Sequence, residues 1–150
     1  MKRQFVAQAP RTGKMLLKFG DFHMYKGIGP RQLRDLGNTV AELADGEGRP
    51  SLHILLLGAK GVHATFAGFG RPLGNQPFVM TDDPEYKFLE PALSAMTPGS
   101  WTVFDLRPMR LRRIAGANVD WERVINGYDL LVLAPEFTPS ALVSDARPAN

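Results

Sequence analysis

The sequence contains no cysteine and no long apolar run. Without cysteine the chain has no disulfide framework, no thiol nucleophile and no thiolate metal site. The longest apolar runs, residues 54–57 and 130–135, are far shorter than the roughly 20 residues of a membrane-spanning helix, and the basic start is followed by no apolar signal core. We therefore expect a soluble protein with no membrane partner. The missing cysteines favour the cytoplasm without excluding export.

Histidine is also scarce. His53 lies inside an apolar run and His63 inside a short predicted strand, residues 62–66, so both are expected to be packing residues. The three histidines of the chain lack the two-histidine helical spacing of a zinc motif. No metal ligand is predicted, and the sequence identifies no cofactor.

The chain has the size of one ordinary domain. It has 150 residues, 44% of them hydrophobic, which is enough for a single buried core. Composition divides it into a basic leader at residues 1–12, a single α/β domain at residues 13–141 and a tail at residues 142–150.

The net charge of +3 is unevenly distributed, since residues 1–36 hold eight Lys or Arg against two Asp or Glu. This basic start indicates either a surface for an anionic ligand or nucleic acid, or a solvated leader. A second basic cluster comprises Arg107, Arg110, Arg112 and Arg113, with no aromatic residue inside it. Because single-strand binders need aromatic stacking platforms, nucleic acid is not the expected partner.

Four short apolar runs predict the sheet. They cover residues 14–19, 52–57, 101–106 and 128–134, and each stops at glycine or near proline. Runs that are apolar on both sides are typical of strands buried on both faces, as in parallel sheets. Between these runs, apolar residues recur at helical spacing. The pattern therefore predicts an α/β fold with a mostly parallel sheet and helices on both faces.

Three helical segments are expected. The first begins at Gly29-Pro30 and ends at Asp45-Gly46, the second follows Thr81 and is broken at Pro91, and the third covers residues 121–126. The stretch at residues 67–77 is rich in glycine and proline, but its spacing matches no phosphate-binding motif, so a lid or connection over the site is expected.

Polar residues follow the predicted strands. Ligands of open parallel sheets lie outside the carboxyl ends of the strands, so a site is predicted there. Its members are His23 and Asp105 as catalytic residues, and Gly20, Asp21, Tyr25, Lys60, Arg107 and Glu136 as substrate-binding residues.

Two chemical roles follow from these residue types. An imidazole such as that of His23 accepts a proton near neutral pH, with a carboxylate such as Asp105 to orient it. The Arg107 guanidinium suits a carboxylate or an oxyanion. The alternatives are structural: Asp105 and Arg107 as an ion pair beside Pro108, and His23 as a partner of a loop carbonyl.

The stretch Gly20-Asp21-Phe22-His23, followed by Gly27, Gly29 and an amphipathic helix, resembles a known motif. It is similar to the second G-x-x-H element of the superfamily that joins the Tiki/TraB proteins, the ChaN-like haem-binding lipoproteins and the erythromycin esterases. The run at residues 15–27 and the segment GSWTVFDLRP at residues 99–108 resemble esterase-like members, and the likeness covers roughly residues 14–136.

This resemblance implies a larger sheet made of two halves, with His23 in the position of the C-terminal site histidine. The chain departs from the family because it has no first G-x-x-H element and no Glu-Glu pair. It is therefore expected to be either a C-terminal fragment or a shortened relative.

Three functions remain open. The first is the C-terminal portion of an esterase-like hydrolase, in which His23 activates water and Arg107 binds an anionic group, and which is inactive without an N-terminal half. The second is a non-catalytic binding module for a small or haem-like ligand. The third is a dimerising structural domain. The expected partners are accordingly a small-molecule ligand or substrate, and the missing half or a second copy.

Overall fold

The computed structural model describes residues 1–9, 13–65, 74–112 and 118–139, and they belong to two compact units. Unit 1 comprises residues 1–56 and 103–132, and unit 2 comprises residues 57–102 and 133–150. The α-helices are α1 (Lys2–Gln8), α2 (Leu36–Gly46), α3 (Glu90–Ser94) and α4 (Val119–Gly127). The 3-10 helices are η1 (Asp21–His23), η2 (Met80–Asp82), η3 (Lys87–Leu89) and η4 (Arg107–Leu111). The strands are β1 (Ile54–Gly58), β2 (Lys60–Thr65), β3 (Gly74–Val79), β4 (Thr102–Asp105) and β5 (Leu130–Ala134).

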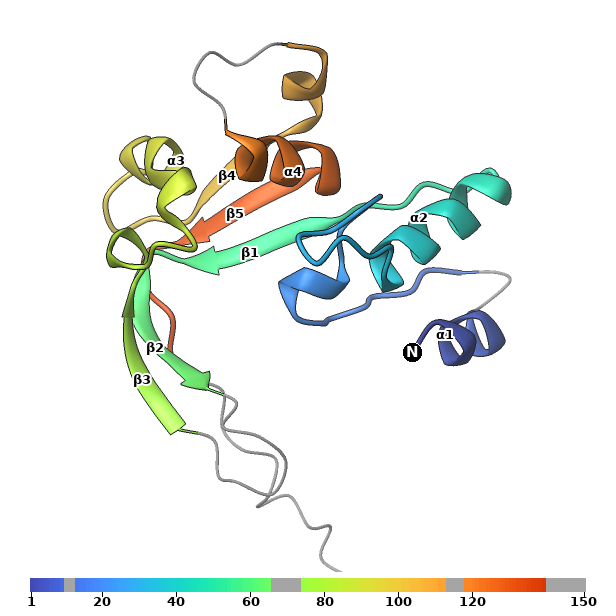
Figure 1. The fold of residues 1–150 in the computed structure, drawn as a ribbon, viewed down its shortest axis with the longest axis horizontal. Coiled ribbons are helices and arrows are strands. Elements are labelled where there is room, and N and C mark those ends of the chain that lie inside the picture. Colours follow the sequence, from blue (N-terminus) through green and yellow to red (C-terminus); the bar gives the residue numbers. More distant parts are fainter. Residues whose placement is uncertain (10–12, 66–73, 113–117, 140–150) are drawn as a thin grey trace, which may run out of the picture. The chain divides into compact units, whose positions relative to one another are not determined.

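Three strands form a small sheet in the order β1-β5-β4 (Figure 1). The backbone N–H of Asp129 donates to the carbonyl of His53 (2.8 Å), so β1 and β5 begin side by side and run parallel. The N–H of Leu106 donates to the carbonyl of Asp129 (2.9 Å), so the end of β4 lies beside the beginning of β5. The strand β4 is therefore antiparallel to β5.

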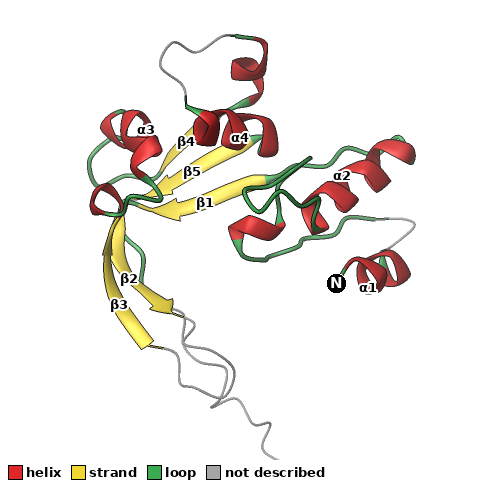
Figure 2. Cartoon of the chain, viewed as in Figure 1, coloured by secondary structure: helices red, strands yellow, loops and turns green. Residues whose placement is uncertain are grey.

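This sheet corrects the predicted fold class. The fold is α/β, as Figure 2 shows, but the sheet is small and mixed, and the helices of the described residues do not cover both of its faces. Strand direction depends on where the connection returns the chain. The segment after β4 passes through η4 and α4 and brings the chain back beside the strand end it left, which makes β4 and β5 antiparallel.

The expectation that the strands are buried on both sides is also wrong. In unit 1, Leu55 and Leu131 are 4% and 0% exposed, whereas Ile54 and Leu56 are 48% and 46% exposed. Successive side chains of a strand point to opposite faces. One face of the sheet is therefore core and the other is open, although both carry apolar residues.

The predicted first strand, residues 14–19, is absent. These residues adopt no regular secondary structure, and Leu16 is almost fully exposed. A strand exists only where a neighbour pairs with its backbone, and no strand of the described chain pairs with this segment.

The helix predicted from Gly29-Pro30 begins later, at Leu36. The N–H of Gln32 closes a turn onto the carbonyl of Gly29 (3.0 Å), and Gln32 has a φ of 57°. That left-handed conformation cannot continue a right-handed helix. Asp35 then caps α2, because its Oδ1 accepts from the N–H of Leu36 (2.8 Å).

The other helices agree better with the sequence. The predicted break at Pro91 is confirmed, since η3 is followed directly by α3, with Pro91 in its first turn. The helix α4 includes the predicted residues 121–126 and ends at Gly127. Its cap is Asn118, whose Oδ1 accepts from the N–H of Trp121 (2.9 Å).

Unit 2 contains an antiparallel hairpin of β2 and β3, with Lys60 opposite Val79 and Gly61 opposite Phe78. The predicted strand at 62–66 is thus part of a hairpin outside the three-stranded sheet. The predicted loop at 67–77 is wrong from residue 74 onward, where β3 begins, and residues 67–73 lie outside the described residues.

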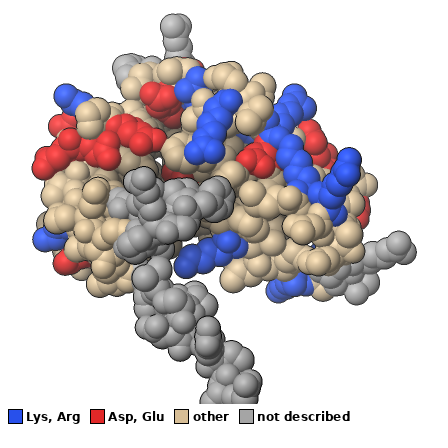
Figure 3. Space-filling view, turned by 60° about the horizontal axis from the view of Figure 1, so that its bottom comes forward, with Lys and Arg blue, Asp and Glu red and all other residues tan. Residues whose placement is uncertain are grey.

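Part of the predicted leader is helical. Residues 2–8 form α1, while residues 10–12 and the predicted tail at 142–150 lie outside the described residues. Charges of both signs share the face shown in Figure 3, with uncharged surface between them. No helix in the described ranges is long and apolar enough to cross a membrane.

Gly61 supplies a stability test for unit 2. It has a φ of 134°, and a Cβ placed there would lie 2.0 Å from the carbonyl oxygen of Phe137. Strain and clash together lead us to expect that Gly61→Ala lowers the free energy of unfolding by roughly 1–3 kcal/mol. Thermal unfolding measures the change. Gly99→Ala is the control, because Gly99 also has a positive φ but open space at Cβ; equal losses in both variants would contradict the role of the Phe137 contact.

Candidate general base and the buried polar cluster

The loop that carries His23 is fixed by contacts with distant residues of unit 1. The hydroxyl of Tyr128 donates to the carbonyl of Asp21 (2.5 Å), and the N–H of Lys26 donates to the carbonyl of Gly127 (3.0 Å). The Tyr25 ring meets the Tyr128 ring edge to face, with centroids 4.8 Å apart. Burial raises the pKa of the Tyr128 phenol far above its ordinary value of 10.0, so the hydroxyl stays a donor.

The ring of His23 is paired with a carboxylate. Nδ1 of His23 lies 2.5 Å from Oδ2 of Asp35, and the two side chains are 31% and 29% exposed. The hydrogen bond from His23 is the main cause that holds the pKa of Asp35 below its ordinary value of 3.8. Asp35 is therefore ionised at neutral pH and fixes the ring with its proton on Nδ1.

The other ring nitrogen of His23 is available. No hydrogen-bond partner of Nε2 occurs among the residues that the structure describes. With the proton on Nδ1, Nε2 carries a lone pair and is partly open to solvent. The arrangement is that of a general base held by an orienting carboxylate.

Close packing sets the position of Asp35 relative to the loop. A Cβ on Gly37, in the first turn of α2, would lie 2.2 Å from the carbonyl carbon of Met24. The helix therefore approaches the backbone of the loop at a point where only glycine fits. The side chain of Asn38 adds a second attachment, since its Oδ1 accepts from the N–H of Gly27 (2.9 Å).

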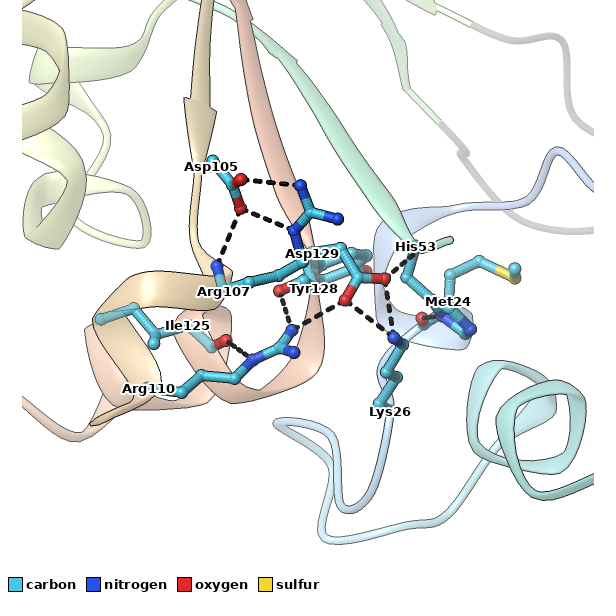
Figure 4. Close-up of polar contacts among 9 residues, drawn as sticks. All are labelled: Met24, Lys26, His53, Asp105, Arg107, Arg110, Ile125, Tyr128 and Asp129. Atoms are coloured by element: carbon cyan, nitrogen blue, oxygen red, sulfur yellow. Dashed lines mark hydrogen bonds and ion pairs between the residues drawn. The ribbon is translucent and has the colours of Figure 1, made fainter. Parts of the chain in front are cut away.

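A second polar cluster surrounds Asp129, whose side chain is 5% exposed (Figure 4). Its carboxylate accepts from Nζ of Lys26 (2.6 and 2.8 Å), from Nη2 of Arg110 (3.1 Å) and from the backbone N–H of His53 (2.7 Å). Burial raises the pKa of Asp129, but these three donors together bring it below its ordinary value of 3.8. The carboxylate is therefore charged and saturated with donors, which makes this cluster structural.

His53 belongs to the same cluster and is 3% exposed. Its Nδ1 lies 2.9 Å from the carbonyl oxygen of Met24, so it donates there, and its buried Nε2 has no hydrogen-bond partner in the described part of the chain. Burial lowers the pKa of His53 below 6.5, because a charged ring here would be desolvated beside Lys26 and Arg110. The ring is therefore neutral. The expectation that His53 packs in the interior is consistent with this burial.

Asp105 and Arg107 form an exposed ion pair. Nε and Nη2 of Arg107 donate to the two carboxylate oxygens (2.8 and 2.7 Å), and the backbone N–H of Arg107 donates as well (3.1 Å). The hydrogen bond from Arg107 lowers the pKa of Asp105 to about 2. Asp105 therefore stays ionised, and its oxygens are occupied by Arg107. The predicted orienting role toward His23 is filled in the structure by Asp35.

The remaining predicted site residues are distributed between the two units. Unit 1 holds Gly20, Asp21 and Tyr25 beside His23, where Gly20 precedes η1 and Tyr25 is buried. Lys60 and Glu136, both exposed, belong to unit 2. Their predicted substrate-binding roles remain predictions. No group of three or more acidic or histidine side chains suited to a metal ion occurs in the described ranges.

Five residues of these clusters are absent from the predicted site: Lys26, Asp35, His53, Arg110 and Asp129. The neighbouring sequence does indicate a role for Asp35, since an aspartate directly before an apolar helical run is a typical N-cap. Asp129 is separated by 103 residues from Lys26 and by 76 from His53, and no local pattern reports such pairings.

Comparisons of the chain with protein-family models, with curated proteins and with solved structures find no match. Function therefore has to be inferred from the geometry of the site.

Removal of the Asp129 charge is expected to be costly. Asp129→Asn leaves Lys26 and Arg110 partly buried without their counterion, and a broken buried ion pair of this kind costs roughly 3–5 kcal/mol. Denaturant unfolding measures the loss. Asp105→Asn is the matched control, because its ion pair is exposed and should contribute little. A loss for Asp129→Asn no larger than that for the control would contradict the structural role of Asp129.

Acid pH is expected to destabilise unit 1 through His53. Its pKa in the folded state is lowered from 6.5, so the unfolded chain binds the proton first, and stability falls as pH decreases below 6.5. His53→Asn keeps a donor near the position of Nδ1 but does not titrate. We expect a smaller loss of melting temperature between pH 7 and pH 5 for this variant, and an unchanged loss for the exposed control His63→Asn. Identical pH dependence in all three proteins would contradict the prediction.

Proposed function

We propose that the chain has a hydrolytic function in which His23 is the general base and Asp35 is its orienting carboxylate. The observation that carries the proposal is the 2.5 Å contact between His23 Nδ1 and Asp35 Oδ2, combined with a partly exposed Nε2 that has no partner among the described residues. The reaction class agrees with the esterase-like resemblance of residues 14–136.

The proposed chemistry is the hydrolysis of an ester. Nε2 of His23 accepts a proton from water as the water oxygen attacks the ester carbonyl, and Asp35 stabilises the imidazolium that forms. The tetrahedral intermediate then collapses, the bond to the leaving oxygen breaks, and the imidazolium returns the proton to that oxygen. The products are an acid and an alcohol, and the base is regenerated.

Rigid positioning of the base supports the proposal. General bases act efficiently when their geometry is fixed before the substrate arrives. Here the loop is held by the Tyr128 hydroxyl, and Asp35 is held by the first turn of α2. The two catalytic groups are therefore already in position before a substrate binds.

The predicted role of Arg107 in binding an anionic group belongs to the same proposal. Its Nε and Nη2 are bonded to Asp105, while Nη1 has no hydrogen-bond partner within the described residues. The Arg107 side chain is 56% exposed, so Nη1 can donate to a carboxylate or phosphate of a substrate.

An activated ester tests the base directly, because a good leaving group needs no acid catalyst. The expected dependence on an N-terminal half concerns the natural substrate, whereas both His23 and Asp35 lie in this chain. We therefore expect the chain alone to hydrolyse p-nitrophenyl acetate with a normal solvent deuterium isotope effect. His23→Ala should lower kcat/KM by about 100-fold or more, the usual contribution of a positioned general base. Asp35→Asn should also lower it, because the amide no longer fixes the ring with its proton on Nδ1.

The controls separate catalysis from folding. His63→Ala removes an exposed histidine of unit 2 and should leave the rate unchanged, and the melting temperature of His23→Ala should remain close to that of the wild type. Turnover that is equal in the wild type and in His23→Ala, or no turnover by the wild type above buffer, would contradict the proposal.

A further inference from the structure

The three-stranded sheet leaves an apolar face open in unit 1. Leu52 precedes β1 and Val103 lies in β4, and they are 58% and 60% exposed. By the alternation of strand side chains, Leu52 shares a face with Ile54 and Leu56, which are also exposed. We define the open face as Leu52, Ile54, Leu56, Val103, Leu130 and Val132, together with Asp105.

This open face differs from scattered surface hydrophobics. Its apolar side chains come from all three neighbouring strands, so they form one continuous surface. Single exposed apolar residues are normal on a folded protein, but contiguous patches mark interaction sites. The strands supply a flat, regular surface of the kind that packs face to face in sheet sandwiches.

The charged residues of the open face indicate what covers it. Asp105 is the one charged residue among the described strand positions on this side, and Arg107 is bonded to it, with side chains 43% and 56% exposed. The face therefore offers one negative and one positive group next to each other and carries no excess of either sign. A surface of this kind is complementary to itself.

We propose that the open face is the interface of a homodimer in which a second copy of this chain packs against it. A two-fold axis through the face brings apolar strands against apolar strands and lets Arg107 approach the partner's Asp105. The interface then has an apolar centre and a charged rim, as stable interfaces do. The proposal does not rest on the hydrolytic function, since neither His23 nor Asp35 belongs to the open face; Arg107 is the one residue that the two proposals share.

Sedimentation velocity of the full chain over a wide range of concentrations tests the proposal. We expect a reversible dimer. Ile54→Lys and Val103→Lys place unpaired charges in the interface and should each weaken the dimer by about tenfold or more in Kd. Val6→Lys is the matched control, because Val6 is similarly exposed but lies on α1; its Kd should be unchanged. Because these positions are exposed, far-ultraviolet circular dichroism should be unaltered in all three variants, and their melting temperatures should match that of the wild type at concentrations where every protein is monomeric.

Charge exchange tests the arrangement of the rim. In the Asp105→Arg variant, two arginines of each copy would face two arginines of the other across the two-fold axis, so the dimer should be weakened. The double variant Asp105→Arg with Arg107→Asp restores one charge of each sign per copy and should restore the dimer. A wild-type protein that remains monomeric, or that forms aggregates without a defined dimer, would overturn the proposal. So would a dimer whose Kd is the same in Ile54→Lys, Val103→Lys and Val6→Lys.

Discussion

Unit 1 depends on the desolvated carboxylate of Asp129. A buried charge is tolerated only when it is paired and hydrogen-bonded, and Asp129 recruits its donors from three other segments of the chain: Lys26, His53 and Arg110. Arg110 also donates to the carbonyls of Ile125 and Tyr128, where α4 ends and β5 begins (Figure 4). One carboxylate therefore ties the loop, the beginnings of two parallel strands and η4 to a single point.

This constraint also explains how the candidate base is positioned. Lys26 and Tyr128 hold the loop at either side of His23, because one bonds to Asp129 and the other donates to Asp21. The loop is thereby presented to Asp35 at the start of α2, where Gly37 allows close approach to Met24. The side chains of His23 and Asp35 are partly exposed, whereas Tyr128 and Asp129, which hold the loop, are buried. The proposed chemistry and the stability of unit 1 therefore depend on separate ionic pairs.

The sequence predicted where apolar strands occur more successfully than how they assemble. Three of the four apolar runs contain a strand of the sheet. The apolar residues of such a strand and the glycine or proline at its end are close together in the sequence, so a short window of sequence is enough to predict them. The direction of β4 was missed, since it depends on the path through η4 and α4. His23 is predicted as a site residue from its residue type and its glycine neighbours, and that role stays a prediction. The partner of its ring could not be predicted, because Asp35 is a helix cap whose second carboxylate oxygen is not needed for the helix.

The strands of the sheet are apolar on both sides, yet one face of the sheet is open. These two observations are related. Ile54 and Val103 are as apolar as the buried Leu55, so the sequence specifies a sheet covered on both faces, while the described chain covers one. Self-association would satisfy this pattern, but it would also bury Arg107 at the rim. An Arg107 engaged with a second copy is not available to a substrate anion, so association and anion binding at this residue exclude each other. The state of assembly would then decide whether Arg107 serves the interface or the proposed reaction, while His23 and Asp35 lie off the open face and are not part of this competition.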